Sequence, residues 1–331
     1  MRAPWIQAQL RQLLSQRGHA WLLQGPSGLG QYSLAVAMAQ AWLCDRASPD
    51  GACGECASCH QFEARAHTDL MVLMPETAMQ VLGWPLGEKA QADIDDKKRK
   101  ASREIRIDAM RDALEFAQRT SGRGRGKVML VYPAERMNHV TANALLKTLE
   151  EPPGDMRFVL ASEAAHQLLP TIRSRCQAHT LAWPEPAQAQ TWLQEEGVPA
   201  AAAPALLRAA GGRPEDALRL HQGGLDAQAW SRWPKALARG DIATVADWGP
   251  AQAVEAMQKL CHDLMAVQSG AAPRFFDTAD LPPPCALPAL SAWWRSLGQT
   301  ARTVEHPFNA GLMLEDLVSQ AKTALNSRGT S

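Results

Sequence analysis

A glycine-rich stretch near the amino end has the spacing of a phosphate-binding loop. It reads Gln24-Gly25-Pro26-Ser27-Gly28-Leu29-Gly30-Gln31-Tyr32-Ser33. In a P-loop, G-x-x-x-x-G-K-[ST], backbone amides cradle phosphates, the lysine reaches the β- and γ-phosphates and the hydroxyl binds Mg²⁺. Gly25 and Gly30 keep the spacing, but Gln31 stands at the lysine position and Tyr32 at the Ser/Thr position. The stretch predicts the frame of the loop without productive ATP binding.

A second expected strand helps to choose among three interpretations of this loop. The chain could be an active NTPase with a displaced lysine, a fold of NTPase ancestry that no longer hydrolyses, or a protein with an accidental glycine turn. In P-loop ATPases a later strand ends in an Asp for Mg²⁺ and often a Glu that activates water. Here Lys127–Val131 ends in Tyr132 and Pro133, and Glu135 is expected to be an exposed turn residue. The second interpretation is favoured because both sites have lost their chemistry.

Four cysteines within a short stretch predict a structural zinc site. They are Cys44, Cys53, Cys56 and Cys59. Four thiolates suit tetrahedral Zn²⁺ and leave no open position for a reactive water. An iron–sulfur cluster and unrelated free thiols are the alternatives, but a ferredoxin run would continue with a fourth cysteine and a proline, whereas His60 and Gln61 follow here. His60 and His67 are expected on a polar helix surface.

Length and composition exclude several classes of protein. With 331 residues the chain should form two or three domains, and its 34 Lys plus Arg equal its 34 Asp plus Glu. A nucleic-acid contact would therefore need a local basic patch. Met1–Gln7 lacks an apolar signal core, and no apolar run reaches the roughly 18 residues of a membrane helix. We expect a cytoplasmic protein without membrane contact.

The elements that would carry these residues alternate between strand and helix in the first half of the chain. Strands are expected at Ala20–Leu23 and Asp69–Met74, and a helix at Ser33–Leu43. Residues 76–103 lack periodicity and are expected to be a solvated insertion tending to disorder. After a linker at Trp183–Pro186 only helices are expected, at 188–196, 201–210, 214–221, 227–239, 251–267, 287–303 and 307–326.

Three further segments resemble a known family. They are the helix end Ala142-Asn143-Ala144-Leu145-Leu146-Lys147-Thr148-Leu149-Glu150-Glu151-Pro152-Pro153, the strand Arg157–Ala161, and the run Leu169-Pro170-Thr171-Ile172-Arg173-Ser174-Arg175-Cys176. Together with the four-cysteine insertion they closely resemble the clamp-loader branch of the AAA+ ATPases. The resemblance is specific over about residues 1–215 and vague beyond.

The resemblance implies a three-part architecture. An α/β P-loop (AAA+) core with a parallel sheet would span 1–182, carrying the zinc module at 44–59 and the insertion at 76–103. A small helical lid would span 183–224, and an all-α oligomerisation (collar) domain 225–331. Arg213 is expected to be a helix-start or lid-packing residue.

The resemblance also implies a function. The chain would be a non-hydrolysing subunit of a bacterial clamp loader, an assembly classed with DNA-directed DNA polymerases, which loads the sliding clamp onto primed DNA. Tau/gamma and delta subunits would be its partners. No residue would be catalytic in cis, but Arg175 would act as an arginine finger on a neighbour's ATP, while Arg173 would be structural. The alternatives are an autonomous AAA+ ATPase or chaperone, and a plain zinc-containing nucleic-acid binder.

Overall fold

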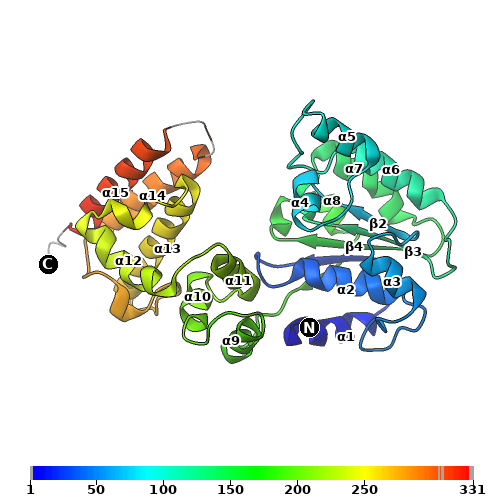
Figure 1. Cartoon of the computed structure of the whole chain (residues 1–331), viewed down its shortest axis with the longest axis horizontal. Coiled ribbons are helices and arrows are strands. Elements are labelled where there is room, and N and C mark those ends of the chain that lie inside the picture. The colour runs from blue at the N-terminus through cyan, green and yellow to red at the C-terminus, as the bar shows by residue number, and fades with distance from the viewer. Residues whose placement is uncertain (1–2, 305, 307–308, 328–331) are drawn as a thin grey trace. The chain divides into compact units, whose positions relative to one another are not determined.

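The chain folds into two compact units, divided between Pro184 and Glu185. The computed structural model describes residues 3–304, 306 and 309–327, and Figure 1 labels most of their helices and strands. Among these residues no helix is both long and apolar enough to cross a bilayer. The further division into a lid at 183–224 and a collar at 225–331 stays a prediction.

The first unit is built on a five-stranded sheet with the order β2-β3-β4-β1-β5, in which every neighbouring pair is parallel. The strands are β1 (Ala20–Gln24), β2 (Leu70–Leu73), β3 (Lys127–Val131), β4 (Met156–Ser162) and β5 (Gln177–Thr180). The central strands β1, β3 and β4 are almost wholly buried, which is why their sequences are apolar runs rather than alternating ones. This parallel α/β sheet is the one expected.

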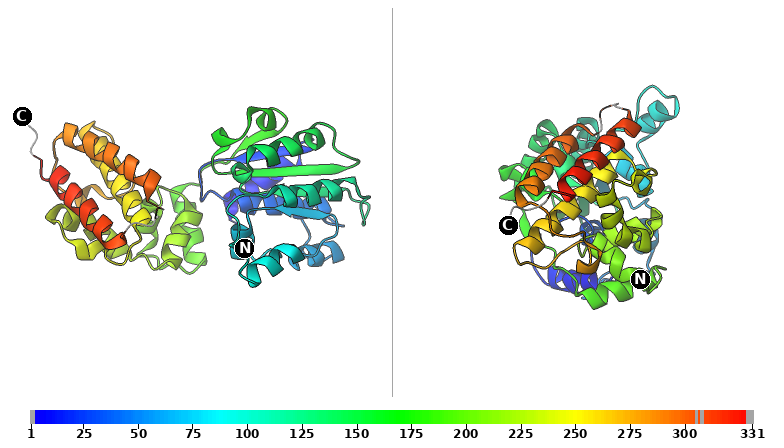
Figure 2. Two further views of the ribbon diagram at one scale, coloured as in Figure 1. Left: turned by 90° about the horizontal axis from the view of Figure 1, so that it is seen from above. Right: turned by 90° about the vertical axis from the view of Figure 1, so that its left-hand side faces the viewer.

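Helices cover both faces of the sheet, as Figures 1 and 2 show. On one face α2 (Gln31–Leu43) packs against β1, β3 and β4, and α1 (Pro4–Leu14) packs against α2. On the other face α6 (Ile107–Gln118) and α7 (His139–Glu150) share a core with alternate strand residues such as Leu22, Met129 and Phe158. The remaining elements of this unit are α3 (Ala57–Glu63), α4 (Glu76–Val81), α5 (Glu88–Asp95), η1 (Ala134–Arg136), η2 (Ala165–Gln167) and α8 (Pro170–Arg173).

The expectation of disorder for residues 76–103 is wrong. The segment contains α4 and α5, and its two ends are joined by Glu76, which is 8% exposed. The Glu76 carboxylate accepts from Arg99 Nη1 and Nη2 at 2.5 and 2.7 Å and from the Ser102 amide at 2.8 Å. Arg99 belongs to the basic run at 97–100, so one charge of a polar run without apolar periodicity orders the segment.

All the regular elements described in the second unit are helices. Its elements are α9 (Pro186–Glu195), α10 (Ala203–Ala209), α11 (Pro214–Gln222), α12 (Ala227–Arg239), η3 (Ile242–Val245), α13 (Pro250–Gln268), η4 (Thr278–Asp280), α14 (Leu287–Thr303) and α15 (Ala310–Leu325). Seven of these are the helices expected from apolar spacing. The expected start of the last helix, Pro307 and Phe308, lies outside the described residues.

Candidate functional site

The glycine-rich loop connects β1 to α2 in the manner of a P-loop. Gly28 and Gly30 have φ values of 76° and 101°, in the left-handed region that favours glycine. Gly30 is the residue before α2, so the loop ends at the helix amino terminus, where a P-loop presents its backbone amides. The frame predicted from the spacing of Gly25 and Gly30 is therefore present.

The side chain of Gln31 is turned back into this loop. Gln31 is 2% exposed, and its Nε2 donates to the carbonyl oxygens of Gly25 and Pro26, both at 2.6 Å. A lysine at this position would carry a positive charge to the phosphates of a nucleotide. The Gln31 amide carries no charge and satisfies the backbone of its own loop instead.

Tyr32 and Tyr132, which are a hundred residues apart in sequence, lie against each other. Their ring centroids are 5.1 Å apart, at an interplanar angle of 33°. The hydroxyl of Tyr132 donates to Glu163 Oε1 at 2.8 Å, just beyond the end of β4. The two positions that in an active ATPase would hold the Mg²⁺-binding hydroxyl and the acidic strand end are thus filled by one aromatic pair.

Trp84, which lies in the insertion at 76–103, extends the pair formed by Tyr32 and Tyr132. The Trp84 indole Nε1 donates to the hydroxyl of Tyr32 at 2.7 Å, and the residue is 7% exposed. The guanidinium carbon of Arg65 lies 4.3 Å from the centroid of the Trp84 ring, and Phe62 meets that ring edge-on at 6.5 Å. Sequence reasoning missed Trp84. A lone tryptophan in a polar segment was the available signal, since a large apolar ring usually finds a core.

Glu135 is not the exposed turn residue that was expected. It is half-buried, and its carboxylate accepts the backbone N–H of Glu163 at 3.1 Å. Its second oxygen, Oε2, is buried without a hydrogen-bond partner among the described residues. Because Oε1 of Glu135 already accepts the Glu163 amide, this carboxylate stabilises the chain just after β4.

The four cysteines form one cluster. Their sulfurs all lie within 4.8 Å of one another, and Cys44 Sγ is 3.6 Å from Cys53 Sγ and 3.8 Å from Cys56 Sγ. Tetrahedral Zn²⁺ with Zn–S bonds of about 2.3 Å would hold its sulfurs about 3.8 Å apart. Backbone N–H groups of Arg46 and Cys53 also point at Cys44 Sγ, at 3.4 and 3.3 Å. The residues present fit a metal of that size.

The cysteine thiols differ in their acidity. The backbone amide of Glu55 donates to Cys53 and lowers the pKa of its thiol to about 6, whereas burial raises the pKa of Cys59 to about 12. Four thiolates so close together would also repel one another, so a bound cation is what would let all four ionise together.

His67 anchors the cysteine module and does not lie on a polar surface, so that expectation is wrong. His67 is 5% exposed, and its Nδ1 accepts from the Asp69 amide at 3.1 Å. Its Nε2 therefore carries the hydrogen and donates to Ser58 Oγ at 2.7 Å, which in turn donates to the Leu43 carbonyl at 2.5 Å. Burial lowers the pKa of His67, which keeps it neutral in this chain of hydrogen bonds.

Arg175 lies in the connection between α8 and β5. Its Nε donates to Glu150 Oε1 at 2.6 Å, its Nη2 pairs with the same oxygen, and its Nη1 donates to the Thr171 carbonyl at 2.8 Å. The next residue, Cys176, has its pKa raised to about 12 by burial, so its thiol stays protonated and unreactive. Arg213, in the other unit, pairs with Asp216 at 2.5 Å at the start of α11.

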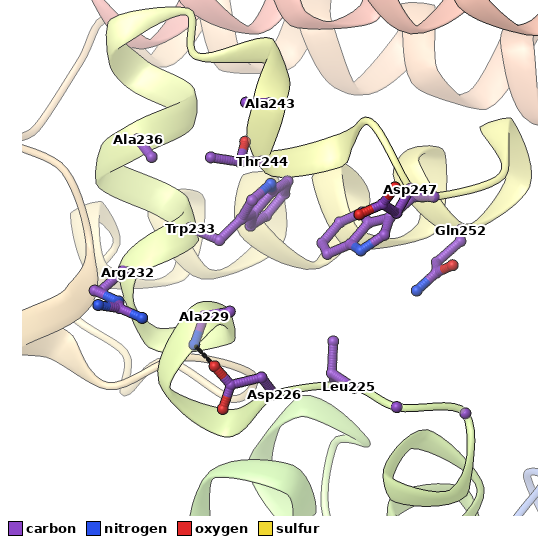
Figure 3. Close-up of a pocket in the computed structure, with 13 residues that line it drawn as sticks. Leu225, Asp226, Ala229, Arg232, Trp233, Ala236, Ala243, Thr244, Asp247 and Gln252 are labelled. Atoms are coloured by element: carbon purple, nitrogen blue, oxygen red, sulfur yellow. Dashed lines mark hydrogen bonds between the residues drawn. The ribbon is translucent and has the colours of Figure 1, made fainter.

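The second unit has a separate hollow of about 480 Å³ beside α12 and η3 (Figure 3). Trp233 lines it, together with Asp226 and Arg232. Asp226 accepts from the Gln228 and Ala229 amides as the cap of α12, and Arg232 Nε donates to the Gln228 carbonyl. Since these charged groups already serve the helix, the hollow is a feature of helix packing.

Comparison with known proteins gives a consistent family. Residues 6–185 match the family model described as "DNA polymerase III, delta subunit". The DNA polymerase III subunit delta' of Pseudomonas aeruginosa is 40% identical over 229 residues, covering 68% of this chain and 63% of the relative. The subunit delta' of Escherichia coli is 34% identical over 226 residues, covering 66% and 61%. The chain thus spans less than two thirds of the length of these relatives.

The sequence is also similar, over a shorter stretch, to other DNA polymerase III subunits. The DNA polymerase III subunit tau of Escherichia coli is 32% identical over 158 residues, 48% of this chain and 20% of the relative. A solved gamma subunit-related protein from Thermotoga maritima aligns with 97% of this chain and 100% of its own at 16% identity, with a TM-score of 0.49. Because the family model spans more than half of the sequence, this chain belongs to the DNA polymerase III delta-subunit family, with delta' subunits among its similar curated relatives.

Proposed function

We propose that this chain is a delta'-type subunit of a bacterial clamp loader that neither binds ATP productively nor hydrolyses it, and that it offers Arg175 to the ATP of a neighbouring subunit. The observation that carries the proposal is the glycine-rich loop, whose lysine and Ser/Thr positions hold side chains that bind or pack within the fold itself. Gln31 donates to the carbonyls of its own loop, and Tyr32 packs against Tyr132 where Mg²⁺ chemistry would be needed. Similarity to delta' relatives supports the same role.

Arg175 supplies what the loop lacks, but to another chain. A guanidinium is planar and always charged, and it can donate two parallel hydrogen bonds to phosphate oxygens. An arginine supplied in trans stabilises the charge that develops on the γ-phosphate during transfer. The Arg175 side chain is 31% exposed, so a neighbouring nucleotide could reach it.

In this role the chain works within an assembly. Its partners are the tau/gamma and delta subunits, and through them the sliding clamp and primer–template DNA in the cytoplasm. The first unit would dock against a neighbour, the helices at 183–224 would form a lid, and those at 225–331 would form the oligomerising collar. No membrane contact is involved.

The cysteine module would hold a structural zinc ion. Cys44, Cys53, Cys56 and Cys59 supply four sulfur ligands, which leaves no position for a substrate or a reactive water. When bound, the ion would cross-link a loop that has only a small core of its own.

The test is a comparison of ATP turnover in the reconstituted assembly. The native chain is co-purified with tau/gamma and delta subunits, and Arg175→Ala is expected to leave assembly intact while slowing turnover at the affected site by up to roughly three orders of magnitude. Arg173→Ala is the matched control, because this exposed arginine lies only two residues away. Unchanged turnover in Arg175→Ala would remove the assignment. Saturable Mg·ATP binding by the isolated chain at micromolar concentration would instead favour an autonomous ATPase.

A further inference from the structure

The guanidinium of Arg175 is held from two neighbouring elements. The end of α7 supplies the Glu150 carboxylate, whose Oε1 accepts from both Nε and Nη2. The start of α8 supplies the Thr171 carbonyl, which accepts from Nη1 at 2.8 Å. Two acceptors on different elements fix both the direction of the side chain and the plane of the guanidinium.

Glu150 is electrostatically unfavourable for α7 at this position. It is the last residue of the helix and is followed by Glu151. The carboxyl end of a helix carries partial negative charge, so acidic side chains there are unfavourable and basic ones favourable. The charge of Arg175 offsets this cost. The stability of the helix alone therefore does not explain a carboxylate at this end. Among the described residues, that carboxylate forms its ion pair with Arg175.

The guanidinium of Arg175 has more donor capacity than its bonds to Glu150 and Thr171 use. A guanidinium has five N–H donors. Among the described residues, Nη2 pairs with Glu150, and Nη1 has a second, longer contact of 3.5 Å to Ser174 Oγ besides its bond to Thr171. Nη2 therefore keeps one N–H, and the long contact of Nη1 to Ser174 is weak enough for a phosphate oxygen to replace it, so these two nitrogens together could make a bidentate contact with a phosphate.

A hollow lies beside this group. It has a volume of about 470 Å³ and is lined by His19, Leu149, Glu150, Ser174 and Arg175. His19 Nε2 donates to the Leu149 carbonyl at 3.0 Å, which satisfies one of the last carbonyls of α7. The Leu149 carbonyl on this wall is thus paired, and the Arg175 guanidinium lines the same hollow beside it.

We propose that Glu150 is a positioning residue, which holds Arg175 with its Nη1/Nη2 edge directed at the polyphosphate chain of a nucleoside triphosphate bound by the neighbouring subunit. The inference rests on the proposed function, since it requires Arg175 to act in trans. Glu150 does not touch the nucleotide. Its carboxylate limits the rotations of a long side chain before the neighbour docks, so that less order has to be gained when the phosphate arrives.

The experiment is a double-mutant cycle in the assembly reconstituted with tau/gamma and delta subunits. Glu150→Ala is expected to lower kcat for ATP roughly two- to fivefold, the range for an exposed charge pair, with KM unchanged because the neighbour's own loop binds the nucleotide. Glu150→Gln keeps an acceptor oxygen and should fall between Glu150→Ala and the native chain. In the Arg175→Ala background Glu150→Ala should have no further effect. Glu151→Ala is the control, as the adjacent carboxylate on the same helix end.

The outcomes separate the positioning role of Glu150 from the trans-acting role of Arg175. Normal or faster turnover with Glu150→Ala, together with slow turnover in Arg175→Ala, would overturn the positioning role and leave the trans-acting arginine intact. A loss from Glu150→Ala that persists in the Arg175→Ala background would mean a structural role and would also overturn it. Native turnover in Arg175→Ala would instead remove the proposed function. Gel filtration of every variant establishes that the assemblies compared are complete.

Discussion

At the scale of single residues, Gln31 shows how a residue at the lysine position of a phosphate loop can remove the nucleotide chemistry while the loop keeps its conformation. The sequence predicts that Gln31 cannot replace a lysine charge, but it does not reveal where the amide goes. In the fold the amide donates to Gly25 and Pro26 carbonyls, so the loop is stabilised by the residue that removes its chemistry. The partners of Tyr32 and Tyr132, namely Trp84 and Glu163, come from distant segments and were not predictable from local spacing.

Restoring the lysine should not restore ATP binding. Gln31→Lys would return a positive charge, but Tyr32 and Tyr132 would still occupy the Mg²⁺ side of the loop. We expect no saturable binding of a fluorescent ATP analogue in the presence of Mg²⁺ at micromolar concentrations. Circular dichroism establishes that the variant is folded. Saturation in that range would show that the aromatic pair yields to a nucleotide.

At the scale of elements, the cysteine module is joined to the sheet by polar links. Arg123 Nη2 donates to Asp45 at 3.0 Å, and Asp69 accepts from the amides of Gly122 and Arg123 at 2.7 and 2.9 Å. Ser58 and His67 form a second link to the end of α2. The module therefore depends on the fold around it as well as on its own sulfurs.

Removing one cysteine should release the metal and lower stability. Cys53→Ser is expected to reduce a content of about one zinc per chain to near zero, because three ligands hold the ion much less tightly than four. Elemental analysis and thermal unfolding measure the two effects. Cys176→Ser, outside the module, is the control and should keep its metal. Iron with visible absorbance in the native chain would contradict the zinc assignment.

Trp84 should be worth more to stability than its place in an insertion suggests. Trp84→Ala would remove a ring that is 7% exposed, which typically costs roughly 3–5 kcal/mol in the free energy of unfolding. Trp84→Phe keeps an aromatic ring but loses the bond to Tyr32, and should cost about 1 kcal/mol. Chemical denaturation of both variants measures the difference. Equal stability of Trp84→Ala and the native chain would mean that the insertion does not brace the loop.

At the scale of the whole molecule, regular periodicity was predictable and long-range contacts were not. The central strands were found because they are short apolar runs, and the long helices of both units because their apolar residues repeat at helical spacing. The insertion was misjudged because its order comes from Glu76 pairing with Arg99, 23 residues away. At the site, the cysteine cluster follows from spacing, whereas the closure of the loop and the partners of Arg175 depend on side chains that only the fold brings together.

The two units should respond separately to perturbation, since each has its own core. Asp263 is fully buried and accepts the amides of Arg274, Phe275 and Phe276 at 2.9, 2.7 and 2.9 Å. Asp263→Asn would leave some of these donors unsatisfied and is expected to cost roughly 1–3 kcal/mol in the second unit. Hydrogen exchange should show faster opening there and unchanged protection of β1, β3 and β4. Uniform loss of protection would indicate one cooperative unit.

The aromatic stack in the second unit gives the protein an optical signature. Trp230 stacks on Trp233 and Phe276 with ring centroids 5.8 and 4.6 Å apart, and Trp248 lies 5.4 Å from Trp233. Aromatic rings held in fixed tertiary packing give a near-ultraviolet circular dichroism signal, which is lost when that packing loosens. The loosening of the helices around this stack could therefore be followed by light alone, without attaching a label.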